Sequence, residues 1–438
     1  MQQLRLLNFY KIISNIATKL VGAFIPLIVI EATGSVALGA LSLGIIYIVR
    51  MLFNFVLKDF YERYPQIALL LRLFTVVLYS VSIMLIDKWL WIGVIGAVLF
   101  YGLDVSLKSL PSEILFNYAS QEQCEGKSPL GFSRLMEQLG ILVALVVGGV
   151  MLDVNKGLIT IISIIIYAIS VIPLFIYFMK SRGQKTFNKD AESNAKIKYD
   201  KNPELKNNAE KISKKILWAY AITYFIFCIQ DVLGNAFNIH IFLETSSYGS
   251  AGYVNAVYNA FYGIGCYIFS YIDSKKETTP LIVISCIASG LLVISLILFP
   301  NFVWWYIAMA VAGMLYGFIC TYPLSRLLPK CRIMGVSNNA LFFRENASNI
   351  SVIFAIIFGL FGSMVPVFIC NMVAMMISSV VMPINEERTR KMLINYLQNH
   401  ERAMTENRSK PNMKDDIILV HVERVKKNSK RRVTNERR

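Results

Sequence analysis

About twelve apolar runs, each near 20 residues long, divide this 438-residue sequence. A helix of that length spans the hydrocarbon core of a bilayer, which is about 30 Å thick. Hydrophobic residues make up 55% of the chain and charged residues 16%, against roughly 45–50% and 25% in soluble domains. We therefore predict an all-α polytopic membrane protein and exclude a soluble enzyme, a disordered chain and a disulfide scaffold. The twelve predicted spans are 9–30, 36–57, 67–86, 89–110, 131–152, 157–179, 215–240, 249–271, 279–299, 302–323, 337–361 and 364–383.

The basic residues are distributed unevenly between the predicted loops. Most of the net charge of +16 lies in segments 180–215 and 384–438. Cytoplasmic loops carry an excess of Lys and Arg. If the N-terminus is cytoplasmic, the only basic residues in the outer loops are Lys88 and Lys156. We therefore predict a multi-pass protein of the plasma membrane with both termini in the cytoplasm.

The sequence also contains an internal repeat. Residues 21–33 (VGAFIPLIVIEAT) resemble 234–246 (GNAFNIHIFLETS), and 89–102 (WLWIGVIGAVLFYG) resemble 304–317 (WWYIAMAVAGMLYG). The pairs Arg134/Gly149 and Arg344/Gly359 recur at nearly the same offset, as do Asp59 and Asp273. We predict two homologous six-helix halves, 1–180 and 215–383, joined by a basic, flexible linker at 181–214 and followed by a basic tail at 384–438.

Two parallel six-helix halves with a long cytoplasmic middle loop resemble the major facilitator superfamily of secondary transporters. The family's loop between helices 2 and 3 reads G-x-x-x-D-R-x-G-R-R, and residues 55–63 keep Asp59 and Arg63 but neither glycine. The antiporter branch has G-x-x-x-G-P-x-x-G-G in helix 5, and residues 140–149 keep the outer glycines. The helix 4 arginine of proton-driven drug exporters is replaced by Val98. The resemblance implies two rocking halves, with the first and fourth helices of each half lining a central cavity.

Polar stripes on these helices supply candidates for substrate and proton binding. Helix 1 places Asn15, Thr18 and Lys19 on one face, because residues three, four and seven apart share a face. Helix 7 carries Asp231, Asn235 and Asn238 in the same way. The full set of candidate binding residues is Asp231, Lys19, Asp104, Asn235, Tyr101, Arg50, Asn15, Asn259 and Tyr262.

Several of these residues have a structural alternative. An ionisable group inside the membrane costs about 2.5–3.5 kcal/mol on insertion scales, so it faces a cavity or a partner. Lys19 and Asp231 either bind substrate and proton or neutralise each other. Arg50 either lines the cavity or pairs with a neighbouring carboxylate, and Lys108 lies near a helix end, where a structural role is favoured.

A second group of charged residues lies toward the cytoplasmic ends of the helices. Arg134, Glu137, Arg344 and Glu345 occupy the inner thirds of helices 5 and 11. We predict that they latch the two halves together and separate as the cavity changes sides. Asp59 and Arg63 are predicted to belong to the same gate.

The sequence offers no enzymatic chemistry. It has three histidines and no GxxxxGK[ST] loop, so we predict no metal site, no cofactor and no ATP-driven transport by this chain. In the tail, residues 384–404 show a helical apolar pattern and could lie along the inner leaflet, and the basic residues of 422–438 would attract anionic lipids. The alternative is a disordered, solubilising tail. No aromatic residues accompany these charges, so we expect no nucleic-acid binding.

These observations predict a monomeric secondary transporter that moves a small organic solute by alternating access. We expect proton coupling, with Asp231 as the first choice and Asp104 as the second choice for the titrating group, and efflux by antiport is favoured. Lys19 would contact an anionic or zwitterionic solute. The alternatives are an uncoupled or symport uptake carrier, and a sensor or scaffold protein with a transporter fold. The sequence does not identify the solute.

Overall fold

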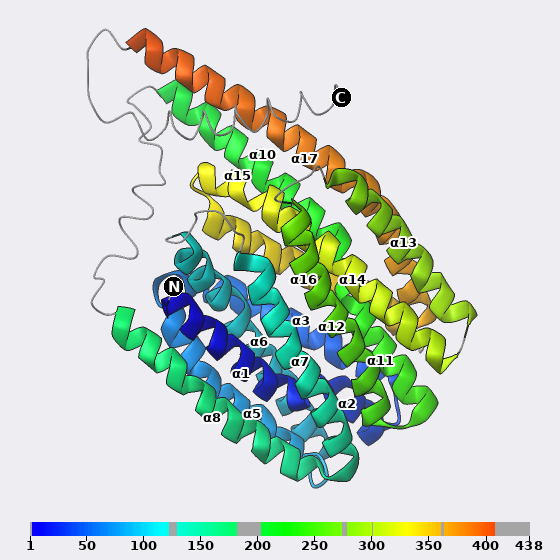
Figure 1. Ribbon diagram of the computed structural model, residues 1–438. Helices are drawn as coiled ribbons and strands as arrows, with labels where there is room; N and C mark the ends of the chain where they lie inside the picture. Colours follow the sequence, from blue (N-terminus) through cyan, green and yellow to red (C-terminus); the bar gives the residue numbers. More distant parts are fainter. Residues whose placement is uncertain are drawn as a thin grey trace.

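The structure, a computed structural model, describes residues 2–121, 129–181, 203–273, 278–299, 301–360 and 363–407. These residues form a bundle of long helices with no strand among them (Figure 1). The first half contains α1 (Gln2–Gly22), α2 (Ile25–Thr33), α3 (Val36–Val56), α4 (Lys58–Arg63), α5 (Pro65–Leu85), α6 (Leu90–Gln121), α7 (Pro129–Val154) and α8 (Lys156–Ser181). The second half contains α10 (Pro203–Phe227), η1 (Cys228–Gln230), α11 (Asp231–Thr245), α12 (Tyr248–Asp273), α13 (Thr279–Leu298), α14 (Phe302–Arg326), α15 (Leu328–Ile333), α16 (Ser337–Gly359) and α17 (Val365–Asn407).

The described helices correspond to the twelve predicted spans. Eleven of the described helical segments are long and apolar enough to span a membrane. In that set, α1 with α2 and α10 with α11 each count as one crossing. The remaining crossing is α12, which is 26 residues long and packs against α7 and α14 inside the bundle. It contains many Gly, Asn, Tyr and Ser residues, so its sequence is less apolar than that of its neighbours.

The first helix of each half is interrupted near its middle. Between α1 and α2 the helix breaks at residues 23–24, and Pro26 follows at the start of α2. Proline has no amide hydrogen to donate to the preceding turn, which accounts for this break. In the second half, the 3₁₀ turn η1 separates α10 from α11 immediately before Asp231. Interrupted helices of this kind form binding sites at mid-depth in many transporters.

The two halves meet along the pairs α7–α12 and α3–α16. At the first pair the backbones approach closely, because a Cβ at Gly252 would lie 2.4 Å from the carbonyl oxygen of Leu145, and one at Gly149 would lie 2.6 Å from that of Tyr248. Small residues permit such contacts between membrane helices. We call the end of the bundle where α8 ends and α10 begins the linker end.

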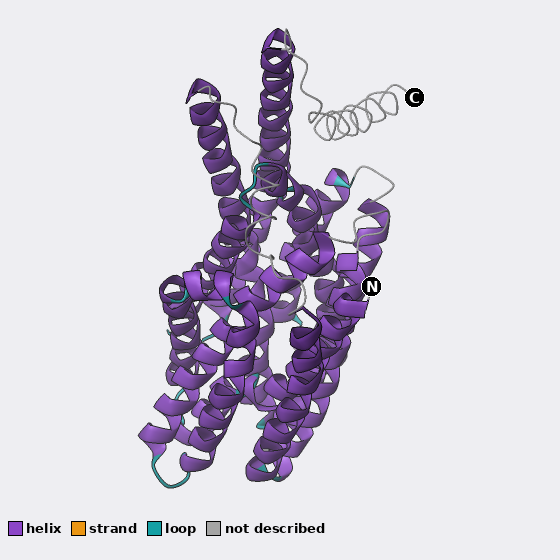
Figure 2. Ribbon diagram, turned by 90° about the vertical axis from the view of Figure 1, so that its left-hand side faces the viewer, coloured by secondary structure: helices purple, strands orange, loops and turns teal. Residues whose placement is uncertain are grey.

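At the linker end, α10 and α17 project beyond the other helices (Figures 1 and 2). α10 begins at Pro203, within the predicted linker, and packs against α17, which continues without interruption to Asn407. Ala209 and Ile216 on α10 and Leu393 and Tyr396 on α17 are buried. Leu393 and Tyr396, which belong to the apolar pattern predicted for 384–404, therefore pack inside the protein, and the side chains of 399–404 lie outside the described residues. The linker residues 182–202 and the basic residues of 422–438 lie outside the described part of the chain.

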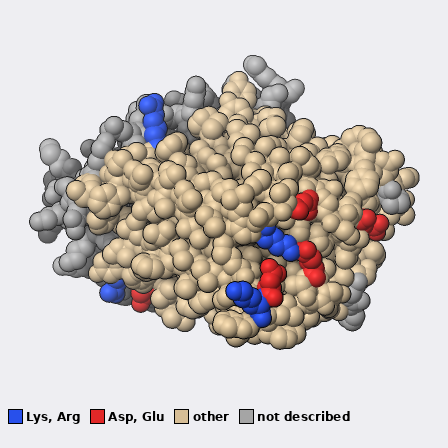
Figure 3. Space-filling view, turned by 90° about the horizontal axis from the view of Figure 1, so that it is seen from below, with Lys and Arg blue, Asp and Glu red and all other residues tan. Residues whose placement is uncertain are grey.

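The outer surface of the helix bundle is mostly uncharged. Large apolar side chains such as Phe74, Ile92 and Ile172 are more than half exposed. Seen from below, the molecule shows only a few charged groups among uncharged side chains (Figure 3). Exposed apolar surface on this scale suits contact with lipid. The chain is thus an all-α, multi-pass membrane protein.

Candidate functional site: a charged cavity between the two halves

A cavity of about 360 Å³ lies between the halves, near the middle of the bundle. Both halves supply its walls, through α1, α3, α6 and α7 on one side and α10, η1, α11, α12, α14 and α16 on the other. The predicted binding residues on these walls are Lys19, Arg50, Tyr101, Asp231, Asn235, Asn259 and Tyr262. The predicted latch residues Arg134, Glu137, Arg344 and Glu345 line the same cavity.

Six of the charged side chains form a continuous series of ion pairs, which we call the charge chain. Its members are, in order, Arg50, Glu345, Arg344, Glu113, Arg134 and Glu137. Arg50 pairs with Glu345, and Arg344 lies 2.5 Å from the other carboxylate oxygen of Glu345. Arg344 lies 3.5 Å from Glu113, which lies 2.8 Å from Arg134, and Arg134 lies 3.3 Å from Glu137.

The charge chain connects the two halves on the side of the cavity nearest the linker end. Arg50 on α3 meets Glu345 on α16, and Glu113 on α6 meets Arg344 on α16, so two of its ion pairs cross between the halves. The predicted latch residues are therefore brought together, although the crossing pairs use Arg50 and Glu113 as partners. Alternating signs neutralise charges that would be costly alone in the membrane.

Asp231 lies in the first turn of α11, on the wall of the cavity that the second half supplies. Its carboxylate accepts hydrogen bonds from the Tyr316 hydroxyl of α14 and, at 3.1 Å, from the Ser348 hydroxyl of α16. Both donors are uncharged. Asp231 is partly exposed to the cavity, so this carboxylate is available to a solute or a proton.

Tyrosine rings form the wall around Asp231. The Tyr316 ring stacks with Tyr262, at a centroid distance of 5.4 Å, and with Tyr258, at 6.4 Å. The Tyr262 hydroxyl donates to the Cys320 sulfur at 3.3 Å. These contacts hold Tyr316 in place as the hydrogen-bond donor to Asp231.

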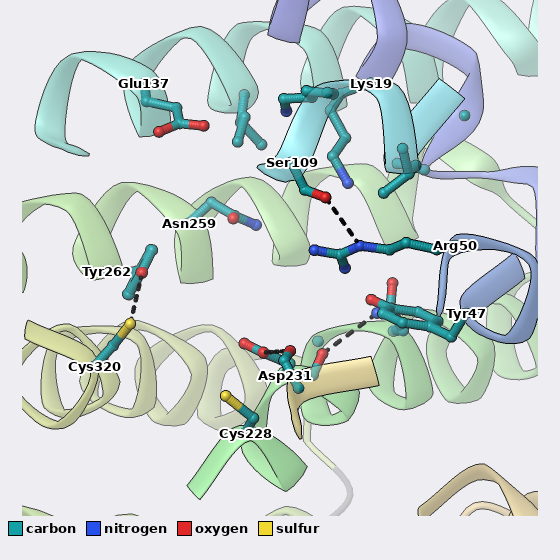
Figure 4. A pocket seen from close by; sticks show the side chains of 18 of the residues that line it. Lys19, Tyr47, Arg50, Ser109, Glu137, Cys228, Asp231, Asn259, Tyr262 and Cys320 are labelled. Atoms are coloured by element: carbon teal, nitrogen blue, oxygen red, sulfur yellow. Dashed lines mark hydrogen bonds between the residues drawn. The ribbon is translucent and has the colours of Figure 1, made fainter. Parts of the chain in front are cut away.

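Lys19 and Lys108 face the cavity from the first half, on α1 and α6. Both are partly exposed. Lys19 and Asp231 are not close enough to form an ion pair, so the predicted neutralising pair is absent from this conformation. In Figure 4, the Arg50 side chain lies between Lys19 and Asp231, and its guanidinium is hydrogen-bonded to Ser109.

Two predicted binding residues lie outside the cavity. Asp104 is 1% exposed and accepts two hydrogen bonds from the fully buried Arg72 guanidinium, both at 3.0 Å. Thr75 also donates to Asp104, at 3.1 Å. Asn15 is fully buried and donates to Glu137 at 2.9 Å. The structure thus places Asp104 in an ion pair inside the first half and Asn15 behind the charge chain.

Asp59 and Arg63 lie on α4 at the linker end, where both are exposed and remote from the cavity lining. Their neighbour Lys58 makes the contact with the other half, donating to Asn339 on α16 at 3.0 Å. α4 itself is anchored by Tyr61, whose hydroxyl lies 2.8 Å from that of Ser106. Burial raises the pKa of Tyr61 to about 12, so this anchor remains neutral.

A separate set of contacts closes the end of the bundle opposite the linker. Asp153, at the end of α7, accepts hydrogen bonds from the backbone N–H groups of Tyr248 and Gly249 at 2.8 and 2.9 Å. The Tyr248 hydroxyl donates to Glu31 on α2, which also lies 2.5 Å from Lys156. Asp153 therefore caps the first turn of α12 across the boundary between the halves.

Sequence reasoning missed three residues of the site. Glu113 lies beyond the predicted end of span 89–110, on a helix that continues to Gln121. A signal for it existed, because the repeated arginines Arg134 and Arg344 require an acidic partner. Tyr316 occupies the repeat position of Tyr101 and could have been found from that alignment, whereas no pattern pointed to Ser348.

Within the described residues, His, Cys, Asp and Glu side chains form no group of three or more suited to a metal ion. The cavity instead offers charged, hydroxyl and amide groups around a space of small-molecule size. Such a site can bind a polar solute from two sides.

Comparisons with known proteins agree with this architecture. The sequence profile of the Major Facilitator Superfamily matches residues 125–329. A comparison with curated proteins gave no significant match. A solved POT family transporter, in complex with a thioalcohol-conjugated peptide, is 11% identical with a TM-score of 0.60, and the alignment covers 88% of this chain and 96% of that chain.

Two other solved transporters have the same fold. The nucleoside transporter NupG is 14% identical with a TM-score of 0.53, covering 90% of this chain and 99% of that one. A bacterial homologue of the iron transporter ferroportin, in an outward-facing state, is 13% identical with a TM-score of 0.60, covering 88% and 100%. The sequence profile and the shared fold confirm the predicted resemblance, and the chain has the architecture of a major facilitator superfamily transporter.

Proposed function

We propose that the protein is a proton-coupled secondary transporter that carries a small organic solute across the plasma membrane by alternating access. The family match, the transporter fold and a central cavity lined by both halves support the carrier function. The solved neighbours are a POT family transporter in complex with a conjugated peptide, a nucleoside transporter and a bacterial homologue of an iron transporter. At such low identity they give no solute for this chain.

The position of Asp231 is the observation that supports proton coupling. Asp231 is the one acidic cavity-lining residue of the described chain that lies outside the charge chain. Two hydroxyl groups hold it in place without neutralising it. A carboxylate at this depth is costly while charged, so binding and releasing a proton would be coupled to the conformation of the cavity.

In the proposed cycle, the two ends of the cavity open in turn. Opening at the linker end separates Arg50 from Glu345 and Arg344 from Glu113. Opening at the other end separates Asp153 from the first turn of α12 and Glu31 from Tyr248. Asp231 lies between these two sets of contacts, so it is reached from one side at a time.

We favour efflux by antiport, in which a proton enters as the solute leaves. The glycines that this chain shares with the antiporter branch of the family support that direction. Gly148 and Gly149 permit close backbone contacts, since a Cβ there would lie 2.2 Å from the Leu20 carbonyl oxygen and 2.6 Å from that of Tyr248.

The orientation follows from the basic residues of the linker and tail, which favour a cytoplasmic linker end. We propose that the protein functions as a monomer whose basic tail contacts anionic lipids. In a background without native cysteines, single cysteines at positions 33 and 155 should react with an impermeant thiol reagent from outside intact cells, and one at position 195 should not. Labelling at position 195 from outside would reverse the orientation.

Transport can be tested with the purified protein in liposomes. A thermal-shift screen first identifies a solute, because a ligand that binds the folded form raises its apparent stability. A pH gradient is then imposed across the liposome membrane, and accumulation of that solute inside the liposomes is followed with and without a protonophore. The proposal predicts accumulation that the protonophore abolishes. Accumulation that survives the protonophore would contradict proton coupling, and absence of any flux would contradict transport.

A further inference from the structure

We infer that the transported solute carries both a negative and a positive group, as an amino acid or a short peptide does. The inference rests on the proposed transport function and names the class of solute. Nine Lys, Arg, Asp and Glu side chains line the cavity, and six of them belong to the charge chain. The other three, Lys19, Lys108 and Asp231, form no ion pair within 4.0 Å among the described residues.

These three side chains lie on opposite walls. Lys19 and Lys108 come from α1 and α6 of the first half, whereas Asp231 comes from α11 of the second. All three are partly exposed to the cavity. In Figure 4, Lys19 and Asp231 lie apart, with the Arg50 side chain between them in this view. A bound solute would therefore meet positive charge on one side and negative charge on the other.

The carboxylate of Asp231 still has hydrogen-bonding capacity. An ionised carboxylate offers about four acceptor sites, and Tyr316 and Ser348 use two of them. An ammonium group donates up to three hydrogen bonds and could use the remaining sites. The stacked rings of Tyr258, Tyr316 and Tyr262 line the same wall, and aromatic faces attract cations.

The need to contact both kinds of charge then selects among solutes. A purely anionic solute would compensate Lys19 and Lys108 but leave Asp231 unpaired, and a purely cationic one would do the reverse. Removing a charge from water without a partner is expensive, so a solute with both charges gains most from this cavity. The volume of about 360 Å³ is at the small end of the range for ligand pockets, about 300–1,000 Å³. That size suits a single amino acid or a short peptide.

The inference also explains exchange at Asp231. A proton and the positive group of the solute compete for the same carboxylate, so one leaves as the other binds. This competition is what an antiporter requires.

The test uses matched charge forms of the same compounds with the full-length protein in detergent. The panel consists of α-amino acids, short ω-amino acids and dipeptides, each as the zwitterion, the methyl ester (cation only) and the N-acetyl derivative (anion only). Thermal shift and equilibrium binding are measured for each. We expect the best zwitterion to bind at least about tenfold more tightly than either of its singly charged forms, because each of these loses one charge contact.

Substitutions in the cavity test which residue contacts each charged group of the solute. Asp231→Asn should weaken the zwitterion and remove the preference over the N-acetyl form, whereas Lys19→Met with Lys108→Met should remove the preference over the methyl ester. The exposed residues Asp87 and Lys88 provide matched controls, and Asp87→Asn and Lys88→Met should leave all affinities unchanged. If Asp231→Asn does not fold, the lysine variants alone decide the result.

The outcomes separate this inference from the proposed function. Singly charged or neutral forms that bind as tightly as the zwitterions would overturn the inference, as would a panel in which no zwitterion binds. If one of these singly charged or neutral forms were transported, the proposed transport function would still hold. Charge-selective binding of zwitterions without any flux would contradict transport but would still show that the cavity binds solutes with both charges.

Discussion

Arg344 of α16 lies 3.5 Å from Glu113 of α6, and this ion pair joins the two halves of the protein on the linker side of the cavity. Glu113 also pairs with Arg134 at 2.8 Å. One carboxylate thus compensates two arginines that occupy equivalent positions in the repeat. Removal of the Glu113 carboxylate should therefore weaken closure of the linker end more than removal of any exposed charged group.

Glu113→Gln should therefore open the linker end of the cavity. In a background without native cysteines, Ser112→Cys serves as a reporter in the cavity wall. We expect the thiol introduced at position 112 to react about tenfold faster with a thiol reagent. A change of about tenfold corresponds to a loss of roughly 1.4 kcal/mol from the free energy that favours the closed linker end. Asp87→Asn, an exposed carboxylate between α5 and α6, is the control. An unchanged or slower reaction in Glu113→Gln would contradict the latch.

Asp104 should behave as a structural residue. Asp104→Asn leaves the buried Arg72 guanidinium without its counter-ion, and breaking such a pair costs about 3–5 kcal/mol. We expect poor expression and a lower melting temperature, with recovery when Arg72→Met is combined with Asp104→Leu. If Asp104→Asn were as stable as the wild type but lost proton coupling, Asp104 would be the coupling residue.

Asp153 should control the end of the cavity opposite the linker. Asp153→Ala leaves the N–H groups of Tyr248 and Gly249 without their acceptor, and loss of a helix cap costs about 1 kcal/mol. A cysteine at position 246 should then label several-fold faster from outside, while Asp153→Asn, which keeps an acceptor oxygen, should have a smaller effect. Equal labelling in Asp153→Ala and the wild type would show that this contact does not hold the end closed.

The tail should divide into a structural and a dispensable part. Removal of 408–438 should leave flux unchanged, because all the residues that line the cavity lie earlier in the chain. Removal from residue 386 onward deletes Leu393 and Tyr396, which are buried, and Glu386, which lies 3.2 Å from Lys330. The longer deletion should lower the melting temperature. Loss of flux in the shorter deletion would favour the sensor or scaffold alternative.

The sequence predicted the fold well because each span leaves its own local signal. Apolar length identifies a crossing, and the repeat relates residues such as Tyr101 and Tyr316 that lie far apart in the chain. The polar stripes likewise identified Lys19, Arg50 and Asp231 as cavity residues.

Pairing between helices was harder to predict. A stripe shows that Asp104 shares a face with Tyr101 and Lys108, but the rotation of the helix decides which of them reaches the cavity. Asp104 turns toward Arg72, and Lys108 lines the cavity. The lengths of α6, α10 and α17 were also underestimated, because their ends are polar and extend past the apolar runs.

The most direct test of the account is solute transport by Asp231→Asn in liposomes. Asparagine keeps the size of Asp231 and one acceptor oxygen, and its amide N–H can donate to the oxygen of the second hydroxyl, but it cannot carry a proton. With a solute identified for the wild type, the account predicts that the variant still exchanges solute across the membrane but no longer concentrates it under a pH gradient. A variant that folds normally and concentrates the solute as the wild type does would contradict the central role of Asp231.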